Sequence, residues 1–191
     1  MVDQSFLHDG LDFMAGKVGG IGSIPLTAPT PCREWELGAL LNHVIATTTL
    51  LSRIAAGHPV EAEHLAPAAT AATAFTGEPE QAFAKAAALA RETFADPGGW
   101  ERTVAMPTGA EFPGAVLAKL IALDAVAHGW DIARATGQDD TLPAPLVDTA
   151  MAFATDFVRP EVRGTTIGHQ VHVGPAATKT ERFVAFLGRQ P

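Results

Sequence analysis

The sequence predicts an all-α fold in which amphipathic helices pack as a bundle. Apolar residues make up 47% of the 191 residues and alanine is abundant, whereas aromatic residues account for 7% and tyrosine is absent. Apolar side chains recur at helical spacing in several segments, and Gly and Pro clusters separate these segments. A chain of this length can bury a sizeable core. We therefore expect residues 1–191 to form a single helical domain.

The first two predicted helices are amphipathic. Helical spacing of apolar residues marks the first one at Leu7, Leu11, Met14 and Val18. Glycines at 19–22 end this helix, and a proline-rich connection over residues 25–31 follows. The second helix is expected from about residue 35 to 56. Its apolar stripe consists of Leu37, Leu40, Leu41, Val44, Thr48 and Leu51.

Four potential metal ligands lie in the next stretch, residues 58–77, which is rich in Ala, Thr and Pro. They are His58, Glu61, Glu63 and His64. We expect this stretch to be a connection, and exposed loop residues are the simpler interpretation of the four side chains. A third helix is expected over residues 79–95, where Phe83 and Phe94 share one side with alanines. Residues 102–113 are expected to form a short hairpin or an ordered loop.

A long helix over residues 114–136 is the centre of the predicted fold, and Gly137 is a suitable C-terminal cap. Asp124, His128 and Asp131 follow i, i+4, i+7 spacing and therefore share one face of this helix. Asp124 and His128 are about 6 Å apart along its axis. A buried carboxylate and a buried imidazole are costly unless they are paired or bind a metal. The two side chains bond each other, lie on a solvated seam, or belong to a site.

The C-terminal part is expected to add further helices. A fifth helix opens after Pro143 and carries Leu146, Ala150, Phe153 and Phe157 at helical spacing. An irregular stretch over residues 163–174 contains His169 and His172. A last helix over residues 177–187 directs Phe183 and Leu187 inward.

Composition excludes several classes of function. The formal net charge is −8, and the 13 Lys and Arg residues are scattered, so we expect neither a nucleic-acid interface nor a basic membrane-binding patch. The N-terminus does not look like a signal peptide, and no apolar run is long enough to span a bilayer. The single Cys32 excludes an intrachain disulfide and a multi-cysteine zinc cluster. We expect a cytoplasmic protein.

Bundles build metal sites from side chains of different helices. His43 lies along the apolar stripe of the second helix, where it is either an ordinary core histidine or a ligand. With Asp124 and His128 it would supply two imidazoles and a carboxylate. This set suits zinc first, with nickel or iron as alternatives, and leaves a coordination position open. Asp131 would orient a ligand or replace one.

Two long motifs resemble those of a known family. Residues 30–44, TPCREWELGALLNHV, resemble its TPC-x-x-W-x-x-x-x-L-x-x-H-V segment, and residues 124–137, DAVAHGWDIARATG, resemble its second motif. The ending over residues 186–191, FLGRQP, is similar to that of single-domain members. The family is the DinB-like metal-binding proteins, in the branch related to mycothiol-dependent maleylpyruvate isomerase.

The resemblance implies a four-helix bundle with long crossover connections, extra C-terminal helices and a divalent metal near one end. The family's ligands correspond to His43, Asp124 and His128. Relatives bind a low-molecular-weight thiol such as mycothiol as thiolate, which attacks a small electrophile. The isomerase has Glu where this chain has Asp124, and it has a C-terminal α/β domain where residues 138–191 here read as helices and loop. We therefore do not expect activity on maleylpyruvate.

Two classes of function follow. The first is a metal-dependent thiol transferase or isomerase whose partners are a small thiol and an electrophile. The second is a non-catalytic bundle, stabilised by its metal, that serves in a stress response or binds a small molecule. Cys32 as a nucleophile is a third hypothesis, weaker than a packing role. We expect Trp35 and Trp130 to flank the pocket, with core packing as the alternative for both. We expect the loop histidines 58, 64, 169 and 172 to stay outside the pocket. A homodimer is left open.

Overall fold

The computed structural model describes residues 4–107, 109–164 and 167–191. Its α-helices are α1 (Ser5–Gly19), α2 (Leu37–Ala55), α3 (Pro67–Ala72), α4 (Pro79–Ala95), α5 (Pro97–Glu101), α6 (Gly114–Thr136), α7 (Ala144–Phe157) and α8 (Lys179–Phe186). Short 3-10 turns lie at Ala62–Leu65 and Pro160–Val162, and strands β1 (Thr103–Ala105) and β2 (Glu111–Pro113) form a hairpin. The all-α prediction is confirmed.

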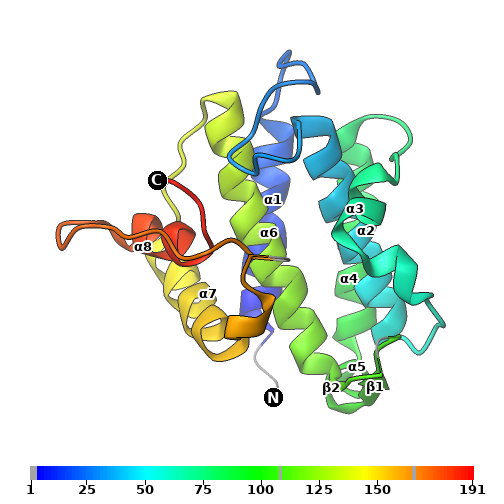
Figure 1. Ribbon diagram of the computed structural model, residues 1–191. Coiled ribbons are helices and arrows are strands. Elements are labelled where there is room, and N and C mark those ends of the chain that lie inside the picture. The colour runs from blue at the N-terminus through cyan, green and yellow to red at the C-terminus, as the bar shows by residue number, and fades with distance from the viewer. Residues whose placement is uncertain (1–3, 108, 165–166) are drawn as a thin grey trace.

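The helices α1, α2, α4 and α6 form a four-helix bundle. Helix α6 packs on both α1 and α2, and α4 packs on the same two helices from the other side. Figure 1 shows these four helices running side by side. Their inward faces hold the predicted stripes, with fully buried members including Leu11, Met14, Leu40, Leu41, Phe83, Leu117 and Ile121. Burying such apolar side chains supplies the main driving force for the bundle.

Helices α7 and α8 cover one flank of the bundle (Figure 1). A second apolar cluster lies between them and α6, and it includes Leu146, Val147, Ala150, Phe183, Val184 and Leu187. Helix α8 starts with a capping box, in which Thr178 and Glu181 satisfy each other's backbone N–H groups. This packing brings the C-terminal segment of the chain next to α6.

Two segments were open to more than one local structure. Residues 58–77 are not a plain connection, because they contain the 3-10 turn and helix α3. Pro67 occupies the first turn of α3, where its missing N–H costs nothing, and alanines follow it. Helix α3 is held against α2 by a hydrogen bond, in which Nδ2 of Asn42 donates to the carbonyl of Ala71 at 3.0 Å. Strands β1 and β2 pair as an antiparallel hairpin, in which Val104 lies opposite Phe112.

Helix boundaries differ by small amounts from the expected ones. Helix α2 starts at Leu37 and α8 covers Lys179–Phe186, whereas α4 and α6 have the predicted bounds. Within the part of the chain that the structure describes, every helix is too short or too polar to be a candidate for crossing a bilayer.

Candidate metal centre

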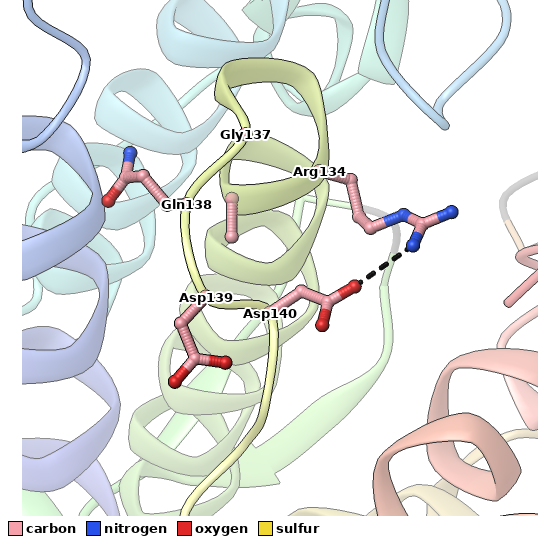
Figure 2. Close-up of a pocket in the computed structure, with 6 residues that line it drawn as sticks. Arg134, Gly137, Gln138, Asp139 and Asp140 are labelled. Atoms are coloured by element: carbon pink, nitrogen blue, oxygen red, sulfur yellow. Dashed lines mark hydrogen bonds and ion pairs between the residues drawn. The ribbon is translucent and has the colours of Figure 1, made fainter.

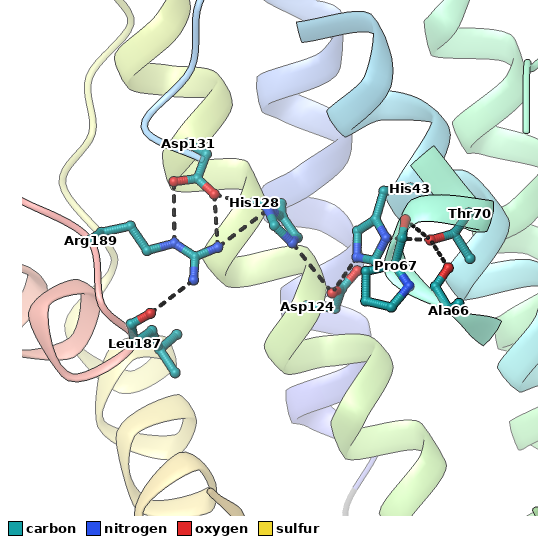
Figure 3. Close-up of polar contacts among 9 residues, drawn as sticks. All are labelled: His43, Ala66, Pro67, Thr70, Asp124, His128, Asp131, Leu187 and Arg189. Carbon is teal, nitrogen blue, oxygen red and sulfur yellow. Dashed lines mark hydrogen bonds and ion pairs between the residues drawn. The ribbon is translucent and has the colours of Figure 1, made fainter. Parts of the chain in front are cut away.

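The three predicted ligands meet between α2 and α6 (Figure 3). Nε2 of His43 lies 3.3 Å from Oδ1 of Asp124, and Nε2 of His128 lies 3.5 Å from the same oxygen. One potential ligand atom from each residue lies within 4.8 Å of the other two. The side chains of His43, Asp124 and His128 are 10%, 20% and 8% exposed, so the cluster is nearly closed to solvent.

Helix geometry and helix packing each supply one part of this arrangement. Asp124 and His128 are one turn apart on α6, which places their side chains over each other on one face. His43 is buried on the face of α2 that packs against α6. The i, i+4 spacing is a property of the sequence, whereas the arrival of His43 at the same level depends on the bundle.

Both imidazole rings direct Nε2 toward Asp124, because Nδ1 of each ring has another hydrogen-bond partner. Nδ1 of His43 lies 2.6 Å from the hydroxyl oxygen of Thr70. That hydroxyl donates to the carbonyl of Pro67 at 2.9 Å, so it accepts a hydrogen from Nδ1 of His43. Nδ1 of His128 lies 2.9 Å from Oδ2 of Asp131 and donates to that carboxylate. In a neutral ring with Nδ1 protonated, Nε2 carries a lone pair.

Three lone-pair donors therefore converge on one point, and this is the arrangement that a cation requires. The second oxygen of Asp124, Oδ2, is buried and has no hydrogen-bond partner among the described residues. An unsatisfied buried polar atom costs about 1–3 kcal/mol, and a bound cation removes this cost. Two imidazole nitrogens and a carboxylate are typical ligands of zinc. The donor set fits a divalent metal ion.

Charge at Asp124 is maintained by its neighbours. Burial opposes ionisation of this carboxyl group, but the close approach of the His43 and His128 imidazoles outweighs it, so the pKa lies below the ordinary value of 3.8. At neutral pH the group is a carboxylate, the form that binds metals.

Asp131 lies behind His128 and is completely buried (Figure 3). Its charge is paired with Arg189, whose Nη2 donates to Oδ2 at 2.9 Å and whose Nε donates to Oδ1 at 3.4 Å. Burial opposes its ionisation, but the charge of Arg189 and the hydrogen bonds from Arg189 and His128 lower its pKa below 3.8. Asp131 is therefore an ionised carboxylate, and in this form it orients the ring of His128.

Cys32 and Trp35 line the same region. The ring of Trp35 lies 4.5 Å from that of His43 and 5.9 Å from that of His128, between centroids, as expected for a residue at the pocket. Cys32, His128 and Asp131 form a second group with potential ligand atoms within 4.8 Å. Burial, opposed by the charge of Arg189, raises the pKa of the Cys32 thiol to about 11. A thiol protonated at neutral pH is a poor nucleophile and a poor ligand, and this favours a packing role for Cys32.

The expectation for Trp130 is wrong. Trp130 is 2% exposed and belongs to the apolar cluster under α7 and α8, with the guanidinium of Arg134 located 5.6 Å from its ring. Two residues along a helix correspond to a rotation of about 200°. The side chain that follows His128 by two positions therefore points away from the metal ligands.

The loop histidines lie outside the cluster. His58, His64, His169 and His172 are exposed, and no group of potential ligands among the described residues includes them. A separate hollow of about 360 Å³ lies at the C-terminal end of α6. Figure 2 shows the residues that line it. It is lined by Ala133, Arg134, Gly137, Gln138, Asp139 and Asp140, and Arg134 pairs with Asp140 at 3.1 Å. The predicted ligands are not among these lining residues.

Comparison with known families identifies the chain's relatives. The model of the mycothiol maleylpyruvate isomerase N-terminal domain matches residues 7–133, which include His43, Asp124 and His128. The chain belongs to this family. Two similar proteins are Uncharacterized protein MT0763 of Mycobacterium tuberculosis (strain CDC 1551 / Oshkosh) and Uncharacterized protein Rv0738 of Mycobacterium tuberculosis (strain ATCC 25618 / H37Rv). Each is 34% identical over 180 residues, which cover 93% of this chain and 92% of the relative. No solved structure matches significantly.

Two residues of the centre escaped the sequence analysis. Thr70 lies within the matched segment, and the signal for it was Pro67 at the start of an alanine-rich stretch, which favours a helix N-terminus. Arg189 lies outside the matched segment. The resemblance of residues 186–191 to a family ending drew attention to this stretch, but nothing in the sequence pairs Arg189 with Asp131.

Proposed function

We propose that this protein is a divalent-metal-dependent transferase or isomerase that uses a low-molecular-weight thiol of the mycothiol type on a small electrophile. We propose zinc as the metal, with His43, Asp124 and His128 as its ligands in a single domain over residues 1–191. The observation that carries the proposal is the convergence of two Nε2 atoms on Asp124, whose Oδ2 has no other described partner.

Family membership supports the choice of thiol, since the matched domain is named for mycothiol. Three protein ligands leave a fourth position of a tetrahedral ion open. A bound divalent ion lowers the pKa of a thiol there, so that the thiol is present as the nucleophilic thiolate at neutral pH.

The chain's own residues hold and shield this site. Thr70 and Asp131 fix the two imidazole rings, which keeps their Nε2 atoms directed at one point. Trp35 covers one side of both rings, and Cys32 packs with it against the bundle core. The low exposure of the ligands limits competition from water for the open position.

A thiol-conjugation assay tests the proposal. Zinc-loaded protein, mycothiol and an electrophilic reporter such as monobromobimane are mixed, and loss of thiol is followed. The new bond joins sulfur to carbon, while bromide and the thiol proton leave. We expect wild-type protein to accelerate the reaction, His128→Ala to lose the acceleration, and His169→Ala to keep it.

Equal rates with wild type and His128→Ala would contradict the catalytic part of the proposal. If zinc is bound in wild type under those conditions, the metal instead stabilises the bundle without catalysis. This second function has one observation in its favour, the low exposure of the three ligand side chains.

A further inference from the structure

We infer that Arg189, near the C-terminus, is a positioning residue of the metal centre. It holds Asp131, and Asp131 in turn holds the ring of His128 with Nδ1 protonated and Nε2 free. This inference rests on the proposed function for the identity of the metal ligands. It adds a component that lies outside the family match over residues 7–133.

The guanidinium of Arg189 donates hydrogen bonds to both oxygens of the Asp131 carboxylate. Nη2 of Arg189 donates to Oδ2 of Asp131 at 2.9 Å, and Nε donates to Oδ1 at 3.4 Å. A two-point contact between a planar fork and a carboxylate defines the plane of the carboxylate. Oδ2, the oxygen that receives the hydrogen of His128 Nδ1 at 2.9 Å, is thereby kept in place.

The backbone fixes the position of Arg189 independently of its side chain. Helix α8 ends in a Schellman motif, in which the N–H of Arg189 donates to the carbonyl of Val184 at 2.9 Å and the N–H of Gly188 donates to that of Ala185 at 3.0 Å. Gly188 has the positive φ of 88° that this motif requires. Leu187, 3% exposed, anchors the turn in the apolar cluster.

The side chain is likewise held on more than one side. Nη1 of Arg189 donates to the carbonyl of Leu187 at 3.2 Å (Figure 3). The side chain of Arg189 is 13% exposed. Nη2 also lies 3.4 Å from Nδ1 of His128. The C-terminal turn therefore reaches the metal centre through one side chain.

Removing this side chain would free the carboxylate. Asp131 would remain completely buried with His128 as its described side-chain partner. A carboxylate with one partner can rotate about its side-chain torsions, and the hydrogen bond that selects the His128 tautomer loses its geometry. Loss of such an outer partner of a ligating histidine typically lowers metal affinity 10–100-fold.

The decisive experiment measures the His128 tautomer in the metal-free protein by ¹⁵N–¹H correlation NMR at pH 8. The spectrum of His128→Gln assigns the signal. We expect the Nδ1–H tautomer in wild type and a mixture of tautomers in Arg189→Met. The matched control is Arg182→Met, because Arg182 is exposed and donates to the backbone carbonyls of Ala177 and Pro175, which precede helix α8.

Zinc dissociation constants from competition with a chromophoric chelator give a second readout. We expect Arg189→Met to weaken zinc binding 10–100-fold and Arg189→Lys to recover part of the loss, since lysine keeps the charge but not the fork. Circular dichroism checks folding, and Arg189→Lys provides the comparison if Arg189→Met does not fold.

The inference is overturned if the folded Arg189 variants retain the wild-type tautomer and bind zinc within twofold of wild type. If wild type does not bind zinc at all, the proposed function fails. The NMR comparison still decides the role of Arg189 in that case, because it needs no metal.

Discussion

Nδ1 of His43 lies 2.6 Å from the hydroxyl oxygen of Thr70, a residue 27 positions further along the chain. Because Thr70 donates its own hydrogen to Pro67, the bond to His43 has one polarity, with the imidazole as donor. Helix α3 is thus connected to the proposed metal centre by one side chain. His128 obtains the same orientation from Asp131, so the two histidines are supported from different parts of the fold.

The Thr70 contact gives a first prediction. Replacing Thr70 with Val keeps the shape but removes the acceptor for His43 Nδ1, and we expect zinc affinity to fall 10–100-fold. Thr70→Ser keeps the hydroxyl and should stay within a fewfold of wild type. Thr73→Val is the matched control, since Thr73 is exposed and bonds the carbonyl of Ala69. Equal zinc affinity in the Val and Ser variants of Thr70 would contradict this role.

The buried pair of Asp131 and Arg189 gives a second prediction. Asp131→Asn leaves the guanidinium of Arg189 buried without a counter-charge, and we expect the free energy of unfolding to fall by about 3–5 kcal/mol. Asp148→Asn removes an exposed pair with Lys179, whose side chains are 56% and 62% exposed, and should cost about 0–1 kcal/mol. Urea unfolding of the metal-free proteins measures both. Similar losses in the two variants would show that the Asp131 pair does not support the fold.

The contact between α1 and α6 gives a third prediction. A Cβ atom at Gly10 would lie 3.1 Å from the Cα and carbonyl oxygen of Ala122, whereas one at Gly16 would meet nothing within 4 Å. We expect Gly10→Ala to destabilise the protein by about 1–3 kcal/mol. Gly16→Ala, on the same helix, should stabilise it by about 0.5–1 kcal/mol. Thermal unfolding measures the change in stability of each variant relative to wild type. A Gly10→Ala protein that is as stable as wild type would contradict this close packing.

Cys32 gives a prediction on pH. Its pKa of about 11 in the folded protein lies above the ordinary value of 9.0, because burial disfavours the thiolate. The folded thiol keeps its proton between these values while the unfolded chain loses it. The folded state is therefore most stable, with respect to Cys32, below pH 9. The free energy of unfolding falls as the pH rises from 9 to about 11, because only the unfolded chain gains the thiolate there.

Alkylation measures this property directly. The rate of reaction with iodoacetamide should rise roughly tenfold per pH unit up to about 11 and be slow at pH 7, because the thiolate is the reactive form. Mass spectrometry after timed quenching gives the rate, and a short cysteine peptide serves as the control. A rate for Cys32 that levels off below pH 9 would contradict the buried environment.

Much of the bundle could be predicted because its helices are long and strongly patterned. The bounds of α4 and α6 followed from Pro79 at the start of one and Gly137 at the end of the other. Helix α3 was missed, since a six-residue helix is too short to display periodicity. Its ordering comes from tertiary contacts such as that of Asn42 with Ala71, which no local pattern contains.

The site was predictable to the extent that helical spacing determines it. Asp124 and His128 are neighbours on any α-helix, whereas the 3.3 Å approach of His43 depends on how α2 and α6 pack. Arg189 is separated from Asp131 by 58 residues, and its position depends on the turn after α8. Trp130 is close to His128 in sequence, but it lies about 200° around the helix from His128 and therefore packs in the second apolar cluster.

The most direct test of the account is a metal-binding measurement on wild type and two ligand variants. Native mass spectrometry and thermal melts are recorded for wild type, His43→Ala and His128→Ala, with zinc and with chelator, and His169→Ala serves as control. We expect one zinc ion per wild-type and control chain and none in the ligand variants, because two ligands hold a divalent ion poorly. At a hundredfold excess over Kd, zinc should stabilise wild type by about 2.7 kcal/mol, and chelator should not change the melts of the variants. Stoichiometric zinc in His128→Ala, or the same chelator response in all four proteins, would contradict the proposed centre.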